Sequence, residues 1–122
     1  MGASDPEGID GGPRPAAASV HTRPADGARL VVAVSGEVDL SNAGDVEAQV
    51  VEAMAGVGAV AIDLNGVTYL DSRGLQLLLR LAERHAHHSL DLVIVAAPRS
   101  IAYELLQVTG LVEVVPVVPG LG

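Results

Sequence analysis

Apolar residues in this chain gather in short continuous runs, separated by stretches in which they recur every three or four positions. Continuous runs rich in Val, Ile and Leu are typical of strands that lie inside a sheet. Such runs predict strands over residues 30–34, 60–64, 92–96 and 112–118. A shorter edge strand is expected over residues 19–23, and the Asp26-Gly27 pair that follows it predicts a reversal of the chain.

Helical spacing marks two shorter segments between these runs. The first predicted helix has Ser41 or Asn42 as its cap, and its apolar face consists of Val46, Val50 and Met54. The other follows Pro98, which fits a first helical turn, and ends at Gly110. Its apolar face is expected to consist of Ile101, Leu105 and Val108.

The strongest helical pattern lies between these two segments. It predicts a helix from Ser72 or Arg73 to His87, with a stripe that consists of Leu75, Leu78, Leu79, Ala82 and Ala86. Before it, the Asn65-Gly66 pair is a local signal for a hairpin. We discount that hairpin, because too few residues remain for a second strand, and expect a loop over residues 65–70.

The elements therefore follow the order β-β-α-β-α-β-α-β. This order predicts a single α/β domain whose mixed, mostly parallel sheet has helices on at least one face. A length of 122 residues fits one domain. We expect the domain to span residues 19–118, between a Gly- and Pro-rich disordered tail at residues 1–18 and a frayed C-terminus at residues 119–122.

Charge and composition narrow the choice of partner. Fifteen acidic residues stand against seven Arg residues, which gives a formal charge of −8. Nucleic acids and acidic membrane surfaces are therefore poor partners, and a protein with a basic groove is a better one. The N-terminus has no charged leader before an apolar run, and no apolar segment reaches the about 18 residues that a membrane span needs. These features predict a soluble cytoplasmic protein.

Catalytic and cofactor chemistry find little support in the chain. Ser72 lacks the glycine that precedes the nucleophile of an α/β hydrolase by two positions, because Leu70 stands there. His85, His87 and His88 do not all share a helical face and have no acidic partner at ligand spacing. Cysteine is absent, and so is a glycine-rich nucleotide loop. We therefore expect no enzyme, no metal site and no cofactor.

The Asp71-Ser72 pair at the start of the strongest predicted helix is the main candidate for function. It can cap the helix, because Ser and Asp oxygens accept hydrogen bonds from the free N–H groups of a first turn. Ser72 can also carry a phosphate, because the same N–H groups and the helix dipole favour negative charge. Ligands dock at the edge of a parallel sheet where strands end, and there Asp39 should face the same side.

Four segments, taken together, carry a resemblance to a known family. They are residues 36–39 (Gly-Glu-Val-Asp), 62–64 (Ile-Asp-Leu), 67–75 (Val-Thr-Tyr-Leu-Asp-Ser-Arg-Gly-Leu) and 108–111 (Val-Thr-Gly-Leu). In these segments the chain resembles the STAS domain, specifically that of the anti-sigma factor antagonist (anti-anti-sigma factor) family. The resemblance covers residues 19–118 and therefore nearly all of the expected domain.

The resemblance implies a bacterial partner switch. In that family a serine directly after an aspartate is phosphorylated by an anti-sigma factor that is also a serine kinase, here of GHKL type, and this position is Ser72. The unphosphorylated protein binds the anti-sigma factor and frees a sigma factor, and a PP2C-type phosphatase resets the phosphorylated form. The implied partner-binding surface consists of Glu37, Asp39, Tyr69, Asp71, Ser72, Arg73 and Gly74.

Arg73 departs from the family pattern, which usually has Ser or Thr after the acceptor. Its guanidinium can hinder a kinase that expects a small residue, pair with a phosphate on Ser72, or simply lie in solvent. A second class of function therefore remains open, in which the chain is a STAS module that does not switch. Such a module would be an accessory subunit of a transport or sensory complex, with Ser72 serving only as a helix cap.

Overall fold

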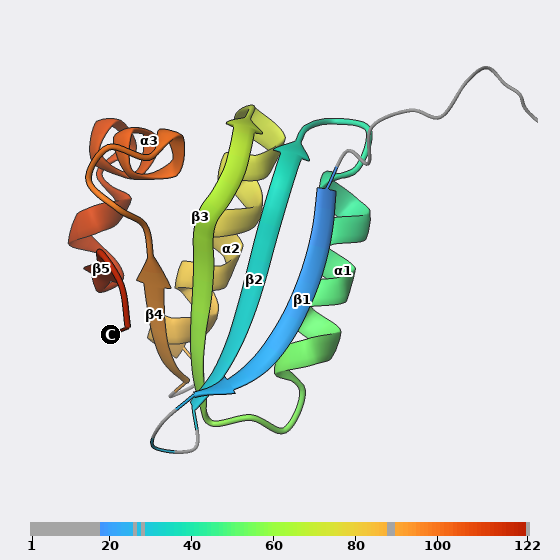
Figure 1. The fold of residues 1–122 in the computed structure, drawn as a ribbon, viewed down its shortest axis with the longest axis vertical. Helices are drawn as coiled ribbons and strands as arrows, with labels where there is room; N and C mark the ends of the chain where they lie inside the picture. The colour runs from blue at the N-terminus through green and yellow to red at the C-terminus, as the bar shows by residue number, and fades with distance from the viewer. Residues whose placement is uncertain (1–17, 26, 28, 88–89, 122) are drawn as a thin grey trace, which may run out of the picture.

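The computed structural model describes residues 18–25, 27, 29–87 and 90–121, and Figure 1 shows them as one sheet with helices packed against it. The strands lie side by side in chain order: β1 (Ala18–Ala25), β2 (Arg29–Val38), β3 (Ala59–Leu70), β4 (Asp91–Val95) and β5 (Val117–Val118). β1 runs antiparallel to β2, and each later pair of neighbours is parallel. The mixed, mostly parallel sheet expected from the sequence is therefore confirmed.

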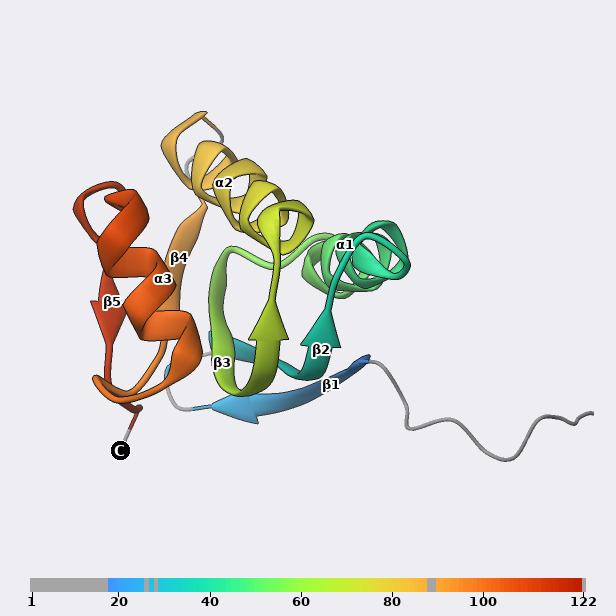
Figure 2. The same cartoon turned by 90° about the horizontal axis from the view of Figure 1, so that it is seen from above.

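Helices connect the parallel strands: α1 (Ala43–Met54), α2 (Ser72–His87) and α3 (Ile101–Thr109), with a short 3-10 helix, η3 (Leu111–Glu113), before β5. Because the strand order follows the chain, right-handed crossovers place successive helices on the same face of the sheet. Figure 2 shows α1 and α2 side by side on that face. The predicted order of strands and α-helices is confirmed, and among the described residues η3 is an element that it did not contain.

The core under the helices is built from aliphatic side chains. Its fully buried members include Val32, Val50, Ile62, Leu78, Leu81, Ile94 and Leu106. The opposite face carries a smaller cluster, which consists of Val31, Ala61 and Val95. Two ion pairs lie along this second face, between Arg29 and Asp91 at 3.0 Å and between Arg23 and Asp63 at 3.9 Å. One face of the sheet therefore holds the main core, and the other carries a small buried cluster and ion pairs.

The predicted loop over residues 65–70 is wrong, because β3 continues through these residues to Leu70. A shift of register between β2 and β3 absorbs an extra residue, so that Ala33 pairs with Asp63 but Ser35 pairs with Gly66. Gly66 fits this close approach: a Cβ there would lie 2.7 Å from the Cβ of Ser35. β2 is also longer than predicted, and its extension to Val38 gives β3 a parallel partner.

The apolar face predicted for the last helix is partly wrong, since of its three residues only Leu105 packs against the core. α3 buries Ala102 and Leu106, whereas Ile101 is exposed and Val108 is 84% exposed. Its cap is Ser100, whose Oγ accepts a hydrogen bond from the backbone N–H of Tyr103 at 3.1 Å, so that Pro98 precedes the helix. One of the two buried residues is the small Ala102, and a pattern of large apolar residues does not reveal a face of this kind.

The strand predicted over residues 112–118 is reduced to the two residues of β5. Gly110 ends α3, as predicted, and it has a left-handed conformation (φ 80°). The chain then turns through η3 before it pairs with β4. The carbonyl of Pro116 still accepts a hydrogen bond from the N–H of Ile94 at 2.9 Å, but proline has no N–H to donate. A short edge strand therefore ends the sheet on this side.

Strand β1 differs slightly from the prediction in its length, and the turn after it is described only in part. β1 begins at Ala18 and ends at Ala25, so it is longer at both ends than the strand expected over residues 19–23. Gly27 has the positive φ (73°) that suits a tight reversal, and its expected partner Asp26 lies outside the described residues. Residues 1–17 of the predicted tail also lie outside them.

Candidate functional site

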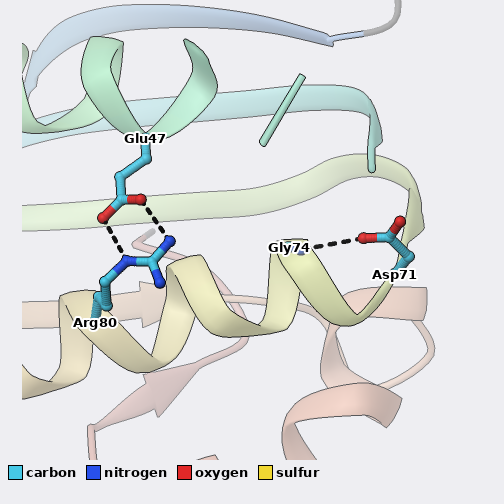
Figure 3. A network of polar contacts seen from close by, with 4 residues as sticks. All are labelled: Glu47, Asp71, Gly74 and Arg80. Atoms are coloured by element: carbon cyan, nitrogen blue, oxygen red, sulfur yellow. Dashed lines mark hydrogen bonds and ion pairs between the residues drawn. The ribbon is translucent and has the colours of Figure 1, made fainter. Parts of the chain in front are cut away.

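Asp71 joins the end of β3 to the start of α2 and caps this helix. Its Oδ1 accepts hydrogen bonds from the backbone N–H groups of Arg73 at 2.9 Å and Gly74 at 3.2 Å, and Figure 3 shows the second of them. N–H groups of the first helical turn have no acceptor within the helix, and an aspartate oxygen is a preferred acceptor for them. The capping role therefore belongs to Asp71.

Ser72 is the first residue of α2, and its side chain is exposed. Within the part of the chain that the structure describes, its hydroxyl has no hydrogen-bond partner. The interpretation of Ser72 as a helix cap is therefore wrong, because the neighbouring carboxylate already binds the first-turn N–H groups. The hydroxyl is left facing solvent at the positive end of a helix dipole.

One prediction separates the two neighbours. Asp71→Ala should lower the free energy of unfolding by about 1 kcal/mol, because two N–H groups lose their acceptor. Ser72→Ala should leave it within about 0.5 kcal/mol of the parent value, as is usual for surface substitutions. Equilibrium unfolding in urea measures both changes. A loss of stability in Ser72→Ala that matched the loss in Asp71→Ala would return the capping role to the serine.

The same carboxylate also ties the end of β2 to the end of β3. Asp71 Oδ2 accepts a hydrogen bond from the backbone N–H of Leu40 at 3.0 Å, and the N–H of Asp71 donates to the carbonyl of Val38 at 3.2 Å. Both oxygens of Asp71 are therefore engaged by backbone donors. The carboxyl ends of the two parallel strands meet here, and such an edge is where ligands usually dock on α/β sheets.

The turn between β2 and α1 is held by its own side chains. Asp39 Oδ1 accepts hydrogen bonds from the hydroxyl of Ser41 at 2.6 Å and from its N–H at 2.9 Å. Asn42 Oδ1 accepts from the N–H of Asp39 at 2.9 Å, and Asn42 Nδ2 donates to the carbonyl of Glu37 at 2.8 Å. Asn42 thus precedes α1, as the sequence indicated, but its side chain fixes the turn and does not cap the helix.

These hydrogen bonds also set the charge of the turn. The Ser41 hydroxyl, and then the Ser41 backbone N–H, lower the pKa of Asp39 below its usual value. A carboxyl group with a lowered pKa is ionised throughout the neutral range. The edge therefore carries a fixed negative charge at Asp39, next in the chain to Leu40, whose N–H binds the carboxylate of Asp71.

Gly74 lies where α2 packs most closely on the sheet. It is buried, and a Cβ in its place would overlap the Leu70 Cδ1, lie 2.9 Å from the Leu70 Cγ and lie 3.3 Å from the Val38 Cγ1. Glycine at this position lets the first turn of α2 settle against the ends of β2 and β3. Its contribution to the edge is thus close packing of the backbone.

The other predicted surface residues lie around this edge with different exposure. Tyr69 pairs with Glu37 across β2 and β3; Glu37 is exposed, and Tyr69 is half exposed. Arg73 is exposed, and among the described residues its guanidinium makes no ion pair. The structure therefore brings all seven predicted residues to one edge, some as side chains in solvent and Gly74 as buried backbone.

Leu40 is the residue of this edge that the sequence analysis missed. It lies in the turn between β2 and α1, and its side chain is 67% exposed. Its neighbours Asp39 and Ser41 are polar, so the available signal was a single large apolar residue inside a polar turn. A single residue forms no periodic pattern, so the sequence did not mark Leu40 as part of the site.

An ion pair fixes α2 relative to α1 further along the helix. Arg80 donates from Nε to Glu47 Oε2 at 2.8 Å and from a terminal nitrogen to Glu47 Oε1 at 2.6 Å, as Figure 3 shows. The hydrogen bond from Arg80 lowers the pKa of Glu47, so the carboxylate stays charged near neutral pH. This two-point contact helps to orient the helix whose first residue is Ser72.

Other kinds of site find no support in the described residues. No group of three or more His, Asp or Glu side chains there is arranged to hold a metal ion. The side chains of His85 and His87, and the whole of His88, lie outside what the structure describes. None of the described helices is long and apolar enough to cross a membrane.

The chain is similar to proteins of known structure. One is an anti-sigma factor antagonist from Mycobacterium paratuberculosis, with 28% identity, a TM-score of 0.74 and coverage of 85% of this chain and 87% of that one. A proposed anti-sigma factor antagonist from Thermotoga maritima has 15% identity, a TM-score of 0.72 and coverage of 84% and 87%. The Bacillus cell fate determinant SpoIIAA in its phosphorylated form has 18% identity, a TM-score of 0.55 and coverage of 81% and 90%.

A family model described as "Mlab, STAS domain" matches residues 21–118, from β1 to the end of β5. The match contains the whole edge formed by the ends of β2 and β3 together with the start of α2. The chain therefore belongs to the STAS domain family, and its fold is shared with anti-sigma factor antagonists.

Proposed function

We propose that this protein is an anti-sigma factor antagonist whose binding to its partner is switched off by phosphorylation of Ser72. The observation that carries the proposal is the exposed, unpartnered hydroxyl of Ser72 beside the capping carboxylate of Asp71. A kinase can reach this hydroxyl without unfolding the domain. The similarity to anti-sigma factor antagonists supports the choice of partner class.

A phosphate on Ser72 can change the affinity for the partner by a large factor. A phosphate adds about −1.5 to −2 charges to the surface that the partner would cover, where binding strips its water or sets it against acidic groups of the partner. A like charge of the partner about 4 Å away costs about 1 kcal/mol in bulk water and about 4 kcal/mol near a protein surface. Since each 1.4 kcal/mol is about tenfold in affinity, one phosphate can weaken binding by about ten to a thousandfold.

The partner that fits this role is an anti-sigma factor with GHKL-type serine kinase activity. It would bind the surface around Ser72, where Glu37, Tyr69 and Arg73 are exposed, and would release a sigma factor on binding. A PP2C-type phosphatase would remove the phosphate and restore binding. The net charge of −8 favours a partner surface that is basic.

Phosphorylation itself is the direct test. The protein is incubated with a GHKL-type anti-sigma factor kinase from the same genome and ATP, and the phosphate is mapped by mass spectrometry. Ser72 should be modified, and Ser72→Ala should stay unmodified under the same conditions. Phosphate on another residue of the wild-type chain, with Ser72 unlabelled, would sink the proposal.

A second candidate function follows from Arg73. A large cation stands directly after Ser72 and is exposed, where the resemblance leads one to expect a small residue. This favours a STAS module that does not switch and acts as an accessory subunit of a transport or sensory complex. In that case Ser72→Ala and Ser72→Asp should bind the partner equally well.

A further inference from the structure

We propose that Leu40 is the apolar anchor of the partner interface, and that the protein that reads Ser72 has an apolar pocket which receives this side chain. The inference rests on the proposed function, because it concerns the same partner. It adds a residue outside the segment around Ser72, and it states what the matching surface of the partner must contain.

Exposure alone does not single out Leu40, because isolated apolar side chains are common on protein surfaces. What distinguishes Leu40 is the rigidity of the turn that presents it. The N–H of Leu40 donates a hydrogen bond to the Asp71 carboxylate. The carboxylate of Asp39 accepts from the hydroxyl and the N–H of Ser41, and Oδ1 of Asn42 accepts from the N–H of Asp39. The backbone that carries Leu40 is therefore fixed before binding, so less backbone freedom is lost when a partner binds there.

Leu40 is also tied physically to the phosphorylation site. One carboxylate, that of Asp71, accepts from the N–H of Leu40 through Oδ2 and from the N–H of Arg73 through Oδ1. The turn that carries Leu40 and the helical turn that begins with Ser72 therefore donate to the same carboxylate. A partner that covers the Ser72 hydroxyl also reaches Leu40.

The surroundings of Leu40 define the chemistry of the matching pocket. Leu40 is 67% exposed and stands between polar residues, and the Asp39 carboxylate beside it is ionised. Interfaces commonly place an apolar anchor inside a rim of polar contacts, with a few residues carrying most of the affinity. The partner should therefore offer an apolar pocket with a hydrogen-bond-donating rim.

Binding measurements on three variants test this inference. The probe is the kinase that phosphorylates Ser72 in the assay described above, without ATP, and affinity is measured by calorimetry. Leu40→Ala should bind at least about tenfold more weakly than wild type, as expected for an anchor residue. Leu40→Met keeps the apolar volume and should bind within a few-fold of wild type.

Val108→Ala is the matched control, because Val108 is 84% exposed and lies on α3, outside the turn that carries Leu40. It should bind like wild type. Thermal melts of all three variants should coincide with wild type, since none of these side chains is buried.

The possible outcomes separate this inference from the proposed function. If Ser72→Asp loses binding while Leu40→Ala binds like wild type, Leu40 is not the anchor and the switch stands. If neither substitution affects binding, both proposals fail. Equal losses in Leu40→Ala and Val108→Ala would show a general effect of removing apolar surface, and would also overturn the role of Leu40. If no kinase modifies Ser72, no protein reads this site and both proposals fall together.

Discussion

Ser72→Asp should lose binding to the anti-sigma factor that the proposed function assigns as its partner. The substituted carboxylate stands beside Asp71, whose oxygens already hold the N–H groups of Leu40, Arg73 and Gly74. The new charge lies on the surface that the partner would cover, and binding would have to strip its water or set it against acidic groups of the partner. We expect affinity to fall by about ten to a thousandfold, and surface plasmon resonance with the purified kinase measures it.

Two further variants control for this result. Ser72→Ala removes the hydroxyl without adding charge and should bind constitutively, with or without ATP. Gln107→Asp adds the same charge on an exposed position of α3 and should bind like wild type. A loss of affinity in Gln107→Asp as large as in Ser72→Asp would mean that net charge, and not the site, controls binding.

Gly74→Ala should destabilise the domain by about 1–3 kcal/mol, the range for overpacking a buried site. The added methyl group collides with Leu70 and comes within 3.3 Å of the Val38 Cγ1 atom, and both side chains are buried. Alanine is favoured over glycine in a helix by up to about 1 kcal/mol, which offsets only part of this cost. Urea unfolding measures the change.

Gly44→Ala is the matched control within the same fold. Gly44 lies in α1, is exposed, and a Cβ there meets nothing within 4 Å. The substitution should therefore stabilise the domain by about 0.4–1 kcal/mol, through helix propensity and a less flexible unfolded chain. Opposite signs for the two substitutions are the expected result. Stabilisation in both would show that α2 does not pack tightly at Gly74.

Much of the architecture could be predicted from local patterns. The runs around Val32, Ile62 and Ile94 are continuous because these strands lie inside a sheet. The apolar repeat of α2 predicted the helix, but its predicted stripe is partly wrong: Leu79 is 46% exposed, whereas Leu77 and Leu81 lie in the core. Strands and helices that alternate then leave few possible topologies. The single-sheet α/β fold follows from these constraints.

The errors arose where a segment takes its structure from a neighbour distant in the chain. Residues 65–70 extend β3 because β2 offers them a partner, although Asn65 and Gly66 suggest a turn. α3 shows Ile101 and Val108 to solvent because close packing on the sheet favours the face with Ala102. In both cases a contact between elements outweighs a local preference.

For the candidate site, the sequence by itself determined the residue types and their place between a strand and a helix. It identified Asp71 and Ser72 as a pair but could not divide their roles, because either side chain can cap a helix. Only the tertiary structure decided that Asp71 caps α2 and leaves the Ser72 hydroxyl exposed. It also brought Leu40 to the same edge, since the hydrogen bond from Leu40 to Asp71 joins residues that are 31 positions apart.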